Sequence, residues 1–159
     1  MSVRHHVSRI TFIVALAALL LATCAPASTE PQPPDIAYGQ DMCDACGMII
    51  SEARFASALL LTNGEVRKFD DTGDMFAYHM DHPDQQVRAW FVHDYRTEEW
   101  VRGEKAFYVV SPAVKSPMGR SIAAFATQEA AKDFAAGVGA QVFNFEEARL
   151  QAHVMVHGG

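Results

Sequence analysis

The sequence is poor in several residue types, and each shortage excludes a class of protein. Its 159 residues hold only three cysteines, and 13 lysines and arginines stand against 19 aspartates and glutamates, a formal net charge of −6. So acidic a surface is a poor match for nucleic acid, whose phosphates attract basic side chains. No Ser-His-Asp set, phosphate-binding loop or paired carboxylates stand out along the chain. We therefore predict a protein that is not an enzyme and does not bind nucleic acid.

The chain also lacks an apolar run of about 20 residues, the length that a helix needs to cross a bilayer. A shorter apolar run, residues 10–22, follows the basic residues Arg4 and Arg9. A basic start followed by a short apolar segment is typical of a secretion signal rather than of a permanent membrane helix. We therefore predict that residues 1–23 are a signal peptide and that the rest of the chain lies outside the cytoplasm.

Cys24 closes the sequence Leu21-Ala22-Thr23-Cys24, which resembles the lipobox of bacterial lipoproteins. The cysteine of that motif becomes the acylated N-terminus, so Cys24 is the predicted lipidation site. Ordinary cleavage near Cys24, or an uncleaved anchor, would also place the domain outside the cytoplasm. Residues 24–40 are rich in proline, which favours a stiff, extended tether. The predicted product is a periplasm-facing lipoprotein of the cell envelope, on the outer membrane, with its folded domain at 41–159.

The pattern after residue 41 predicts an α+β fold. Two apolar segments, 54–62 and 65–69, are separated by Asn63-Gly64, a strong hairpin signal. Asp70-Asp71-Thr72 then supplies capping side chains for a helix that ends at His82-Pro83. Further predicted strands cover 88–95, 105–110, 121–125 and 141–145, with helices over 127–136 and 146–151. The aromatic core candidates are Trp90, Phe91, Trp100, Phe107 and Tyr108.

The two predicted helices begin in similar ways. Phe69-Asp70-Asp71-Thr72 precedes one helix and Phe125-Ala126-Thr127 the other. We therefore predict two related strand-strand-helix halves with antiparallel sheets, at about 41–83 and 84–151. The alternative is that both junctions merely reflect the general preference for Asp and Thr at helix starts.

Sulfur ligands provide the main functional signal. Cys46-Gly47-Met48 places a thiol and a thioether around a glycine that lets the backbone turn, and Met118 lies between Pro117 and Gly119. Thiolate and thioether sulfurs together suit copper(I) better than other common metals. A thioether has no proton to lose, whereas Cys46 must ionise to bind a metal. We therefore predict a Cu(I) site with Cys46, Met48 and Met118 as ligands.

Other side chains are weaker candidates. Cys43 forms a Cys-x-x-Cys with Cys46, a pattern that also fits a redox pair, a disulfide, or half of a zinc site completed by His79 and His82. At the end of the chain, His153 and His157 would point to one side if the tail were extended, and could then extend the copper site. Asp70 and Asp71 are predicted to cap the helix. They could also hydrogen-bond a side chain that binds the metal, without binding the metal themselves.

The order and spacing of these motifs resemble the NosL family, whose members are accessory lipoproteins for nitrous oxide reductase. The motifs that carry the resemblance are Cys46-Gly47-Met48, Phe69-Asp70-Asp71, Trp90-Phe91-Val92-His93-Asp94-Tyr95, Trp100, Ala106-Phe107-Tyr108-Val109, Ser116-Pro117-Met118-Gly119, Ile122 and Ala124-Phe125. The resemblance implies a copper(I) chaperone with Cys46, Met48 and Met118 as ligands. It also implies a fold similar to the N-terminal part of organomercurial lyases.

The resemblance further implies nitrous oxide reductase, or its membrane maturation machinery, as the protein partner, and a lipid membrane reached through acylated Cys24. Copper would pass to the partner by ligand exchange. One departure from the family pattern lies near the helix start. This chain has Asp74 at a position where the family pattern has a third cysteine. The rival hypothesis is an exported thiol-disulfide or organomercurial-type enzyme that uses Cys43 and Cys46.

Overall fold

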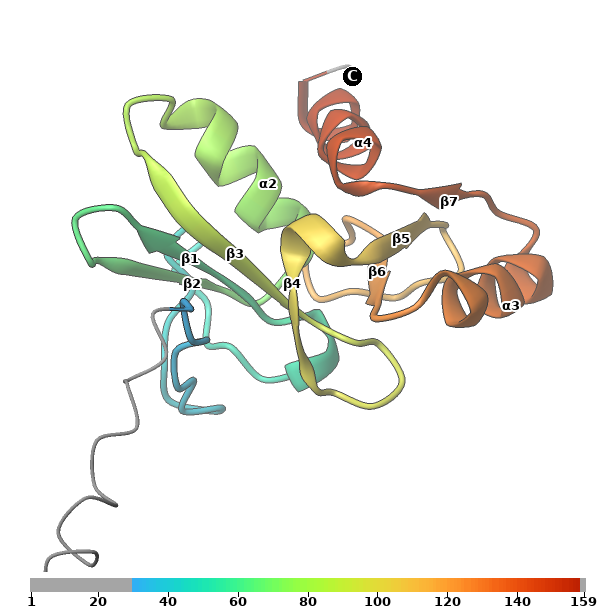
Figure 1. Ribbon diagram of the computed structural model, residues 1–159, viewed down its shortest axis with the longest axis horizontal. Helices are drawn as coiled ribbons and strands as arrows, with labels where there is room; N and C mark the ends of the chain where they lie inside the picture. Colours follow the sequence, from blue (N-terminus) through green and yellow to red (C-terminus); the bar gives the residue numbers. More distant parts are fainter. Residues whose placement is uncertain (1–29, 158–159) are drawn as a thin grey trace, which may run out of the picture. The chain divides into compact units, whose positions relative to one another are not determined.

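The computed structural model describes residues 30–157 (Figure 1). The predicted signal peptide, 1–23, and the predicted lipidation site, Cys24, lie outside the described residues. Within the part of the chain that the structure describes, no helix has the length and apolar character needed to span a bilayer.

The first sheet has four antiparallel strands in the order β2-β1-β3-β4. β1 (Ser57–Leu61) and β2 (Val66–Phe69) form the hairpin predicted around Asn63-Gly64. The Asn63 side chain accepts a hydrogen bond from the Glu65 N–H (2.9 Å) and Gly64 has φ of +89°, which is why this dipeptide turns the chain. β3 (Val87–His93) pairs with the other edge of β1, and β4 (Trp100–Arg102), which the pattern did not predict, pairs with β3.

The second sheet repeats the same topology with three strands. β5 (Phe107–Val110) lies between β6 (Ile122–Phe125) and β7 (Val142–Phe143), so the order β6-β5-β7 matches β2-β1-β3. A helix follows the second strand in each half: α2 (Thr72–Asp81) after β2 and α3 (Gln128–Val138) after β6. The predicted α+β fold of two related strand-strand-helix halves is confirmed, and the structural repeats cover 57–93 and 107–143.

Both helices begin at the capping side chains that the sequence indicates. The carboxylate of Asp71 accepts a hydrogen bond from the Gly73 N–H (2.9 Å), and the hydroxyl of Thr127 accepts one from the Ala130 N–H (3.2 Å). α3 ends at Gly139, whose φ of +64° terminates the helix in a left-handed conformation. Two short 3₁₀ turns, η1 (Ala53–Phe55) and η2 (Gly103–Lys105), precede β1 and β5.

One hydrophobic core joins the two halves. Tyr108 and Ile122 of the second sheet point into the same cluster as Phe69, Phe76 and Trp90 of the first half. On the opposite face of the second sheet, alternate side chains pack against α3. Both faces of this sheet are therefore buried. Of the predicted aromatic core residues, the buried ones are Trp90, Phe91 and Tyr108, and the half-buried ones are Trp100 and Phe107.

The C-terminal segment differs from its prediction. α4 runs over Phe145–His157 and packs against α2, so residues 153–157 are helical and do not form the extended tail in which His153 and His157 would point to one side. Phe145, which the pattern placed at the end of a strand, instead contacts Phe76 with ring centroids 5.6 Å apart. Burying this aromatic ring and the alanines that follow on one helical face stabilises a helix that is longer than the one predicted over 146–151.

The N-terminal boundary also moves. Residues 36–40, assigned to the tether because they follow the proline-rich stretch, are part of the packed domain: Ile36 packs on the core, and the Tyr38 hydroxyl donates to Nε2 of His93 (3.2 Å). Gly39 donates its N–H to the Ile50 carbonyl (2.8 Å). The domain therefore begins a few residues before 41.

Candidate metal centre

Residues 42–49, here called the Cys46 loop, fold back on themselves. Met42 and Ile49 form an isolated antiparallel bridge, and the Cys43 N–H donates to the Met48 carbonyl (2.8 Å). At the tip, Gly47 has φ of +72° and donates its N–H to the Cys43 carbonyl (2.9 Å). A residue with a Cβ would be strained in this conformation, so the glycine that the sequence places between Cys46 and Met48 closes the turn.

The Cys46 loop attaches to the outer edge of β2. The Asp44 N–H donates to the Lys68 carbonyl (2.8 Å), and the Lys68 N–H donates back to the Asp44 carboxylate (2.6 Å). The ammonium of Lys68 also pairs with Asp41 (2.7 Å). β2 is an edge strand whose outward backbone groups need partners, and the loop supplies them. This attachment brings both thiols of the loop close to the end of β2, where Asp70 follows.

Two thiols and two carboxylates converge at this point. One ligand atom from each of Cys43, Cys46, Asp70 and Asp74 lies within 4.8 Å of every other. The Cys46 thiol donates to the carboxylate of Asp70, at a sulfur–oxygen distance of 3.7 Å. Cys43 is buried, and burial raises the pKa of its thiol to about 12. Asp74, in the first turn of α2, pairs with the guanidinium of Arg120 (2.7 Å).

Asp71 fixes the segment that carries Met118. One oxygen of its carboxylate caps α2, and the other accepts hydrogen bonds from the Ser116 hydroxyl (2.6 Å) and from the backbone N–H groups of Met118 (3.2 Å) and Arg120 (3.4 Å). Burial raises the pKa of Asp71, while the hydrogen bonds from Ser116 and the backbone oppose this effect. A single carboxylate thus holds the loop at 111–121 against the start of α2.

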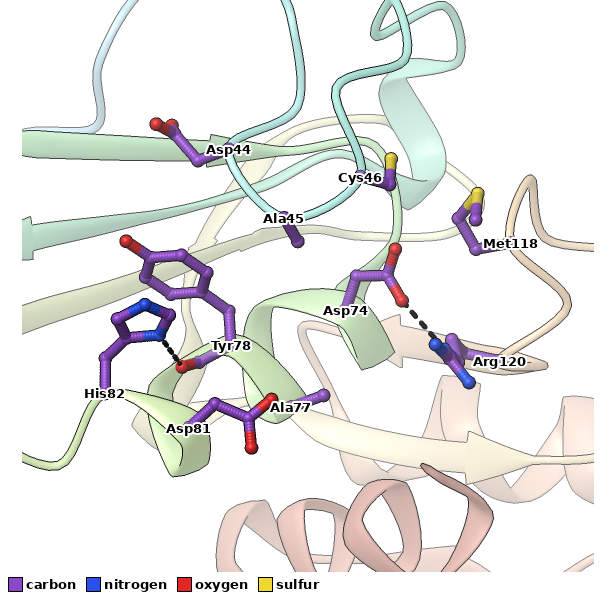
Figure 2. A pocket seen from close by; sticks show the side chains of 10 residues that line it. All are labelled: Asp44, Ala45, Cys46, Asp74, Ala77, Tyr78, Asp81, His82, Met118 and Arg120. Atoms are coloured by element: carbon purple, nitrogen blue, oxygen red, sulfur yellow. Dashed lines mark hydrogen bonds and ion pairs between the residues drawn. The ribbon is translucent and has the colours of Figure 1, made fainter. Parts of the chain in front are cut away.

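Cys46 and Met118 line the same open pocket, which has a volume of about 430 Å³. In Figure 2 the sulfur of Cys46, on its loop, and the sulfur of Met118, on the loop between β5 and β6, lie on the same side of Asp74. The walls continue along α2 through Tyr78 to His82, whose ring stacks on Tyr78 with centroids 4.0 Å apart. Residues distant in the chain therefore share one accessible cavity.

The other predicted ligands lie in different surroundings. Met48 is 54% exposed and does not line this pocket, although its carbonyl closes the Cys46 loop. His153 is exposed on α4, and the side chain of His157 lies outside the described residues. The cluster of potential metal ligands found in the described part of the chain does not include His153.

The alternatives involving the Cys-x-x-Cys can now be compared with the structure. Cys43 and Cys46 are free thiols and form no disulfide with each other. His79 contacts Trp90 and lies 3.3 Å from a nitrogen of Arg149, and Nδ1 of His82 bonds to the Tyr78 carbonyl (2.7 Å). The alternative of a zinc site completed by these histidines finds no support in the described residues, because His79 belongs to the packing between α2 and α4 and the ligand cluster around the two cysteines includes neither histidine.

Asp74 is the residue of the cluster that sequence reasoning did not assign to the site. An acidic residue in the first turn of a helix is ordinary, because it interacts favourably with the helix dipole. Its place in the family pattern, where a cysteine is usual, was the signal that pointed to this position.

Comparison with known proteins shows to which family the chain belongs. The NosL family model matches residues 36–152, from the first packed residue of the domain into α4. The chain belongs to the NosL family. It is 30% identical to the copper-binding lipoprotein NosL of Stutzerimonas stutzeri over 174 residues, which cover 100% of this chain and 92% of that protein.

A solved NosL structure has the same fold. The crystal structure of the copper chaperone NosL from Shewanella denitrificans matches with a TM-score of 0.66 and 25% sequence identity, over 74% of this chain and 96% of that one. The predicted membership of the NosL family is confirmed. Neither NosL relative is named as an enzyme, in agreement with the prediction that this chain is not one.

Proposed function

We propose that the protein is a membrane-tethered copper(I) metallochaperone in which Cys46, Met48 and Met118 bind the ion. The observation that carries the proposal is the shared pocket, because folding brings the thiol of Cys46 and the thioether of Met118 to one cavity from separate loops. Both sulfurs are soft donors suited to copper(I). The names of the two relatives, a copper-binding lipoprotein and a copper chaperone, support copper as the cargo.

The site is built for exchange rather than for permanent retention. Its pocket is open, Met118 is half-buried, and Met48 stands exposed beside Cys46 on a loop only a few residues long. An approaching partner offers its own ligands, and copper(I), which accepts two to four ligands, passes through intermediates that both proteins share. Met48 joins Cys46 and Met118 when its flexible side chain turns toward the ion.

The proposed place of work is the periplasmic side of the cell envelope. Acylated Cys24 holds the chain at the outer membrane, and residues 24–35 form the tether. The client is nitrous oxide reductase or its membrane maturation machinery, as the family resemblance implies. The lipoprotein name of one relative supports the membrane attachment.

Titration with a chromophoric copper(I) chelator under anaerobic conditions tests the binding site. The double variant M48I/M118I, and separately C46S, is expected to bind copper(I) at least about 100-fold more weakly, because each change removes soft ligands. M155I replaces a partly exposed methionine on α4 and serves as the matched control, with unchanged affinity. Affinity retained in both site variants would rule out the proposed ligands.

The client is tested in a denitrifying host that lacks its own copies of this gene. Restoring the wild-type chain is expected to restore the copper content of purified nitrous oxide reductase, whereas C46S and C24A are not. Equal copper loading with and without the chain would rule out this client while leaving the copper site intact.

A further inference from the structure

We propose that Met42, Met48 and Ile49, here called the loop patch, form the surface on which a copper-exchange partner docks, and that this partner presents an apolar surface bordered by lysine and arginine. The partner's task rests on the proposed function, because exchange of copper(I) requires another protein to reach Cys46. Met42 and Ile49 serve docking alone, whereas Met48 serves docking and copper binding.

The loop patch is exposed although its members are large and apolar. The exposed fraction is 62% for Met42 and 54% for each of Met48 and Ile49. Large apolar side chains scattered singly over a surface are ordinary, whereas a group of them marks an interaction site. These three side chains belong to one short loop, so they form such a group.

The backbone of the Cys46 loop brings Met42 and Ile49 together. The two residues face each other in an antiparallel bridge, and side chains that are directly opposite in such a pair are neighbours. A hydrogen bond from the Ile50 N–H to the Asp41 carbonyl (2.9 Å) holds this pairing. The adjacent residues Cys43 and Ile50 are buried. Because side chains alternate along extended chain, Met42 and Ile49 face away from the core.

The loop patch adjoins the proposed copper site. Met48 is separated from Cys46 by a single glycine, and Cys46 lines the open pocket together with Met118. Ligand exchange needs donor atoms of both proteins around one ion, so the surface beside Cys46 must contact the partner. Apolar side chains at this place favour association because docking removes them from water. The methionines also adapt to the shape of the partner, since their side chains are unbranched and flexible.

Carboxylates border the loop patch and define the charge of the partner. Asp44 lies within the Cys46 loop, Glu52 follows the loop closely, and both are exposed. The nearby ammonium of Lys68 pairs with Asp41, and none of the ion pairs found in the described residues includes Asp44 or Glu52. An acidic border attracts basic protein surfaces and repels anionic lipid headgroups. The observations therefore favour a basic protein partner over a membrane surface.

The described part of the chain has a second group of exposed apolar side chains, which provides a matched control. Leu150 is 60% exposed and Val154 is 56% exposed, and their spacing of four residues places them on one face of α4. Neither residue lines the pocket that holds Cys46 and Met118. If exposure alone caused docking, this pair would bind partners as well as the loop patch does.

Photo-crosslinking in living cells of the host identifies what contacts the loop patch. The full-length chain carries p-benzoylphenylalanine in place of Met42, or in place of Leu150 as the control, and mass spectrometry sequences the joined peptide. We expect position 42 to capture one partner protein, through an apolar segment bordered by lysine or arginine, in at least about tenfold higher yield than position 150. In the same chain, E52K should lower the yield about threefold or more, because it removes attraction at the border. E129K, at an exposed position on α3, should not.

Several results of the crosslinking would overturn the proposal. Capture mainly of a second copy of this chain would make the loop patch a self-association surface, and capture of lipid would make it a membrane contact. A partner surface bordered by acidic side chains would contradict the charge argument. Equal yields from positions 42 and 150, including no capture at either, would show that the loop patch has no special partner.

The variant M42K/I49K separates docking from copper binding. Its copper(I) affinity should stay within about threefold of wild type, because neither residue is a proposed ligand, while copper loading of nitrous oxide reductase in the complemented host should fall about fivefold or more. M42L/I49V keeps the patch apolar and should load copper normally, as should L150K/V154K. Thermal unfolding verifies that each variant folds.

The outcomes distinguish this proposal from the proposed function. Normal loading by M42K/I49K, in a host where the wild type restores loading, would refute the docking surface and leave the copper site standing. A large loss of copper(I) affinity in M42K/I49K would also refute it, since these residues would then belong to the metal site. Failure of the wild type to bind copper(I) or to load the reductase would refute the proposed function or its client. In that case the crosslinking result alone decides whether the loop patch is a docking surface.

Discussion

The two halves share one topology but differ at the junction between the second strand and the helix. In the first half, Phe69 at the end of β2 is followed by the buried carboxylates Asp70 and Asp71. In the second half, Phe125 at the end of β6 is followed by Ala126, whose N–H bonds to Asp94 (2.8 Å), and by the exposed Thr127. One junction faces the thiols of the Cys46 loop, and the other performs only the structural task of starting a helix.

This difference shows that the repeated topology is a scaffold. The potential metal ligands come from the junctions and loops in which the two halves differ. The second half contributes to the candidate site through a different feature, the loop between β5 and β6 that carries Met118. The corresponding turn of the first half, Asn63-Gly64, is a minimal hairpin without ligands. Each half therefore supplies one element of the site, and Asp71 joins the two.

The largest expected difference between the two halves concerns the Cys46 loop, which covers the junction of the first half and not that of the second. Because burial raises the pKa of Cys43 to about 12, its thiol is protonated at neutral pH, and protonated thiols react slowly with alkylating reagents. In protein carrying C24A, alkylation of Cys43 at pH 7.5 should be on the order of 1000-fold slower than that of an unperturbed exposed cysteine. Peptide mapping by mass spectrometry measures this rate, and denaturant should abolish the protection. Equal modification in native and denatured protein would mean that the loop does not cover the first half.

The second contrast compares the two helix caps. Asp71→Ala removes a cap and leaves three donors of the Met118 loop without their acceptor, so the free energy of unfolding should fall by about 3 kcal/mol. Thr127→Ala, the equivalent change in the second half, should cost about 1 kcal/mol. Denaturant unfolding provides both values. Similar losses for the two variants would contradict the special role of the first junction.

The third prediction distinguishes the role of Asp71 in holding the Met118 loop from its role in capping α2. Ser116→Ala removes the 2.6 Å hydrogen bond to Asp71 but leaves the cap intact, and should cost about 2 kcal/mol because the acceptor is charged and buried. Copper(I) affinity should also fall, since Met118 loses part of its support. Ser121→Ala, which removes a hydroxyl that donates to the exposed Gly119 carbonyl (3.2 Å), is the control. A normal copper(I) affinity in Ser116→Ala would mean that the loop holds its position without this bond.

The smallest expected effect concerns His93, at the end of β3. Burial lowers its pKa, so the unfolded chain binds a proton more readily than the folded one. The stability associated with neutral His93 is present above its unfolded pKa, near 6.5, and is lost as the pH falls below it. His93→Gln should flatten the decline in the free energy of unfolding between pH 7 and 5. An unchanged pH profile would show that other groups cause the decline.

Much of the scaffold could be predicted because its signals are local. Asn63-Gly64 fixes a hairpin by its backbone preferences, and Asp71 and Thr127 cap helices that begin beside them. The tail at 153–157 could not be predicted in this way. Its helix depends on Phe145 and later residues packing against α2, a contact with residues far away in the chain.

The candidate site could likewise be predicted only in part. The sequence by itself determined the proposed soft ligands Cys46 and Met118, since their chemistry and flanking glycines are visible without a fold. Only the tertiary structure decided that Asp74 joins Cys43 and that Asp71 ties the Met118 loop to α2. The physical reason is that ligand identity belongs to single residues, whereas convergence depends on edge pairing, burial and hydrogen bonds between segments that no local pattern relates.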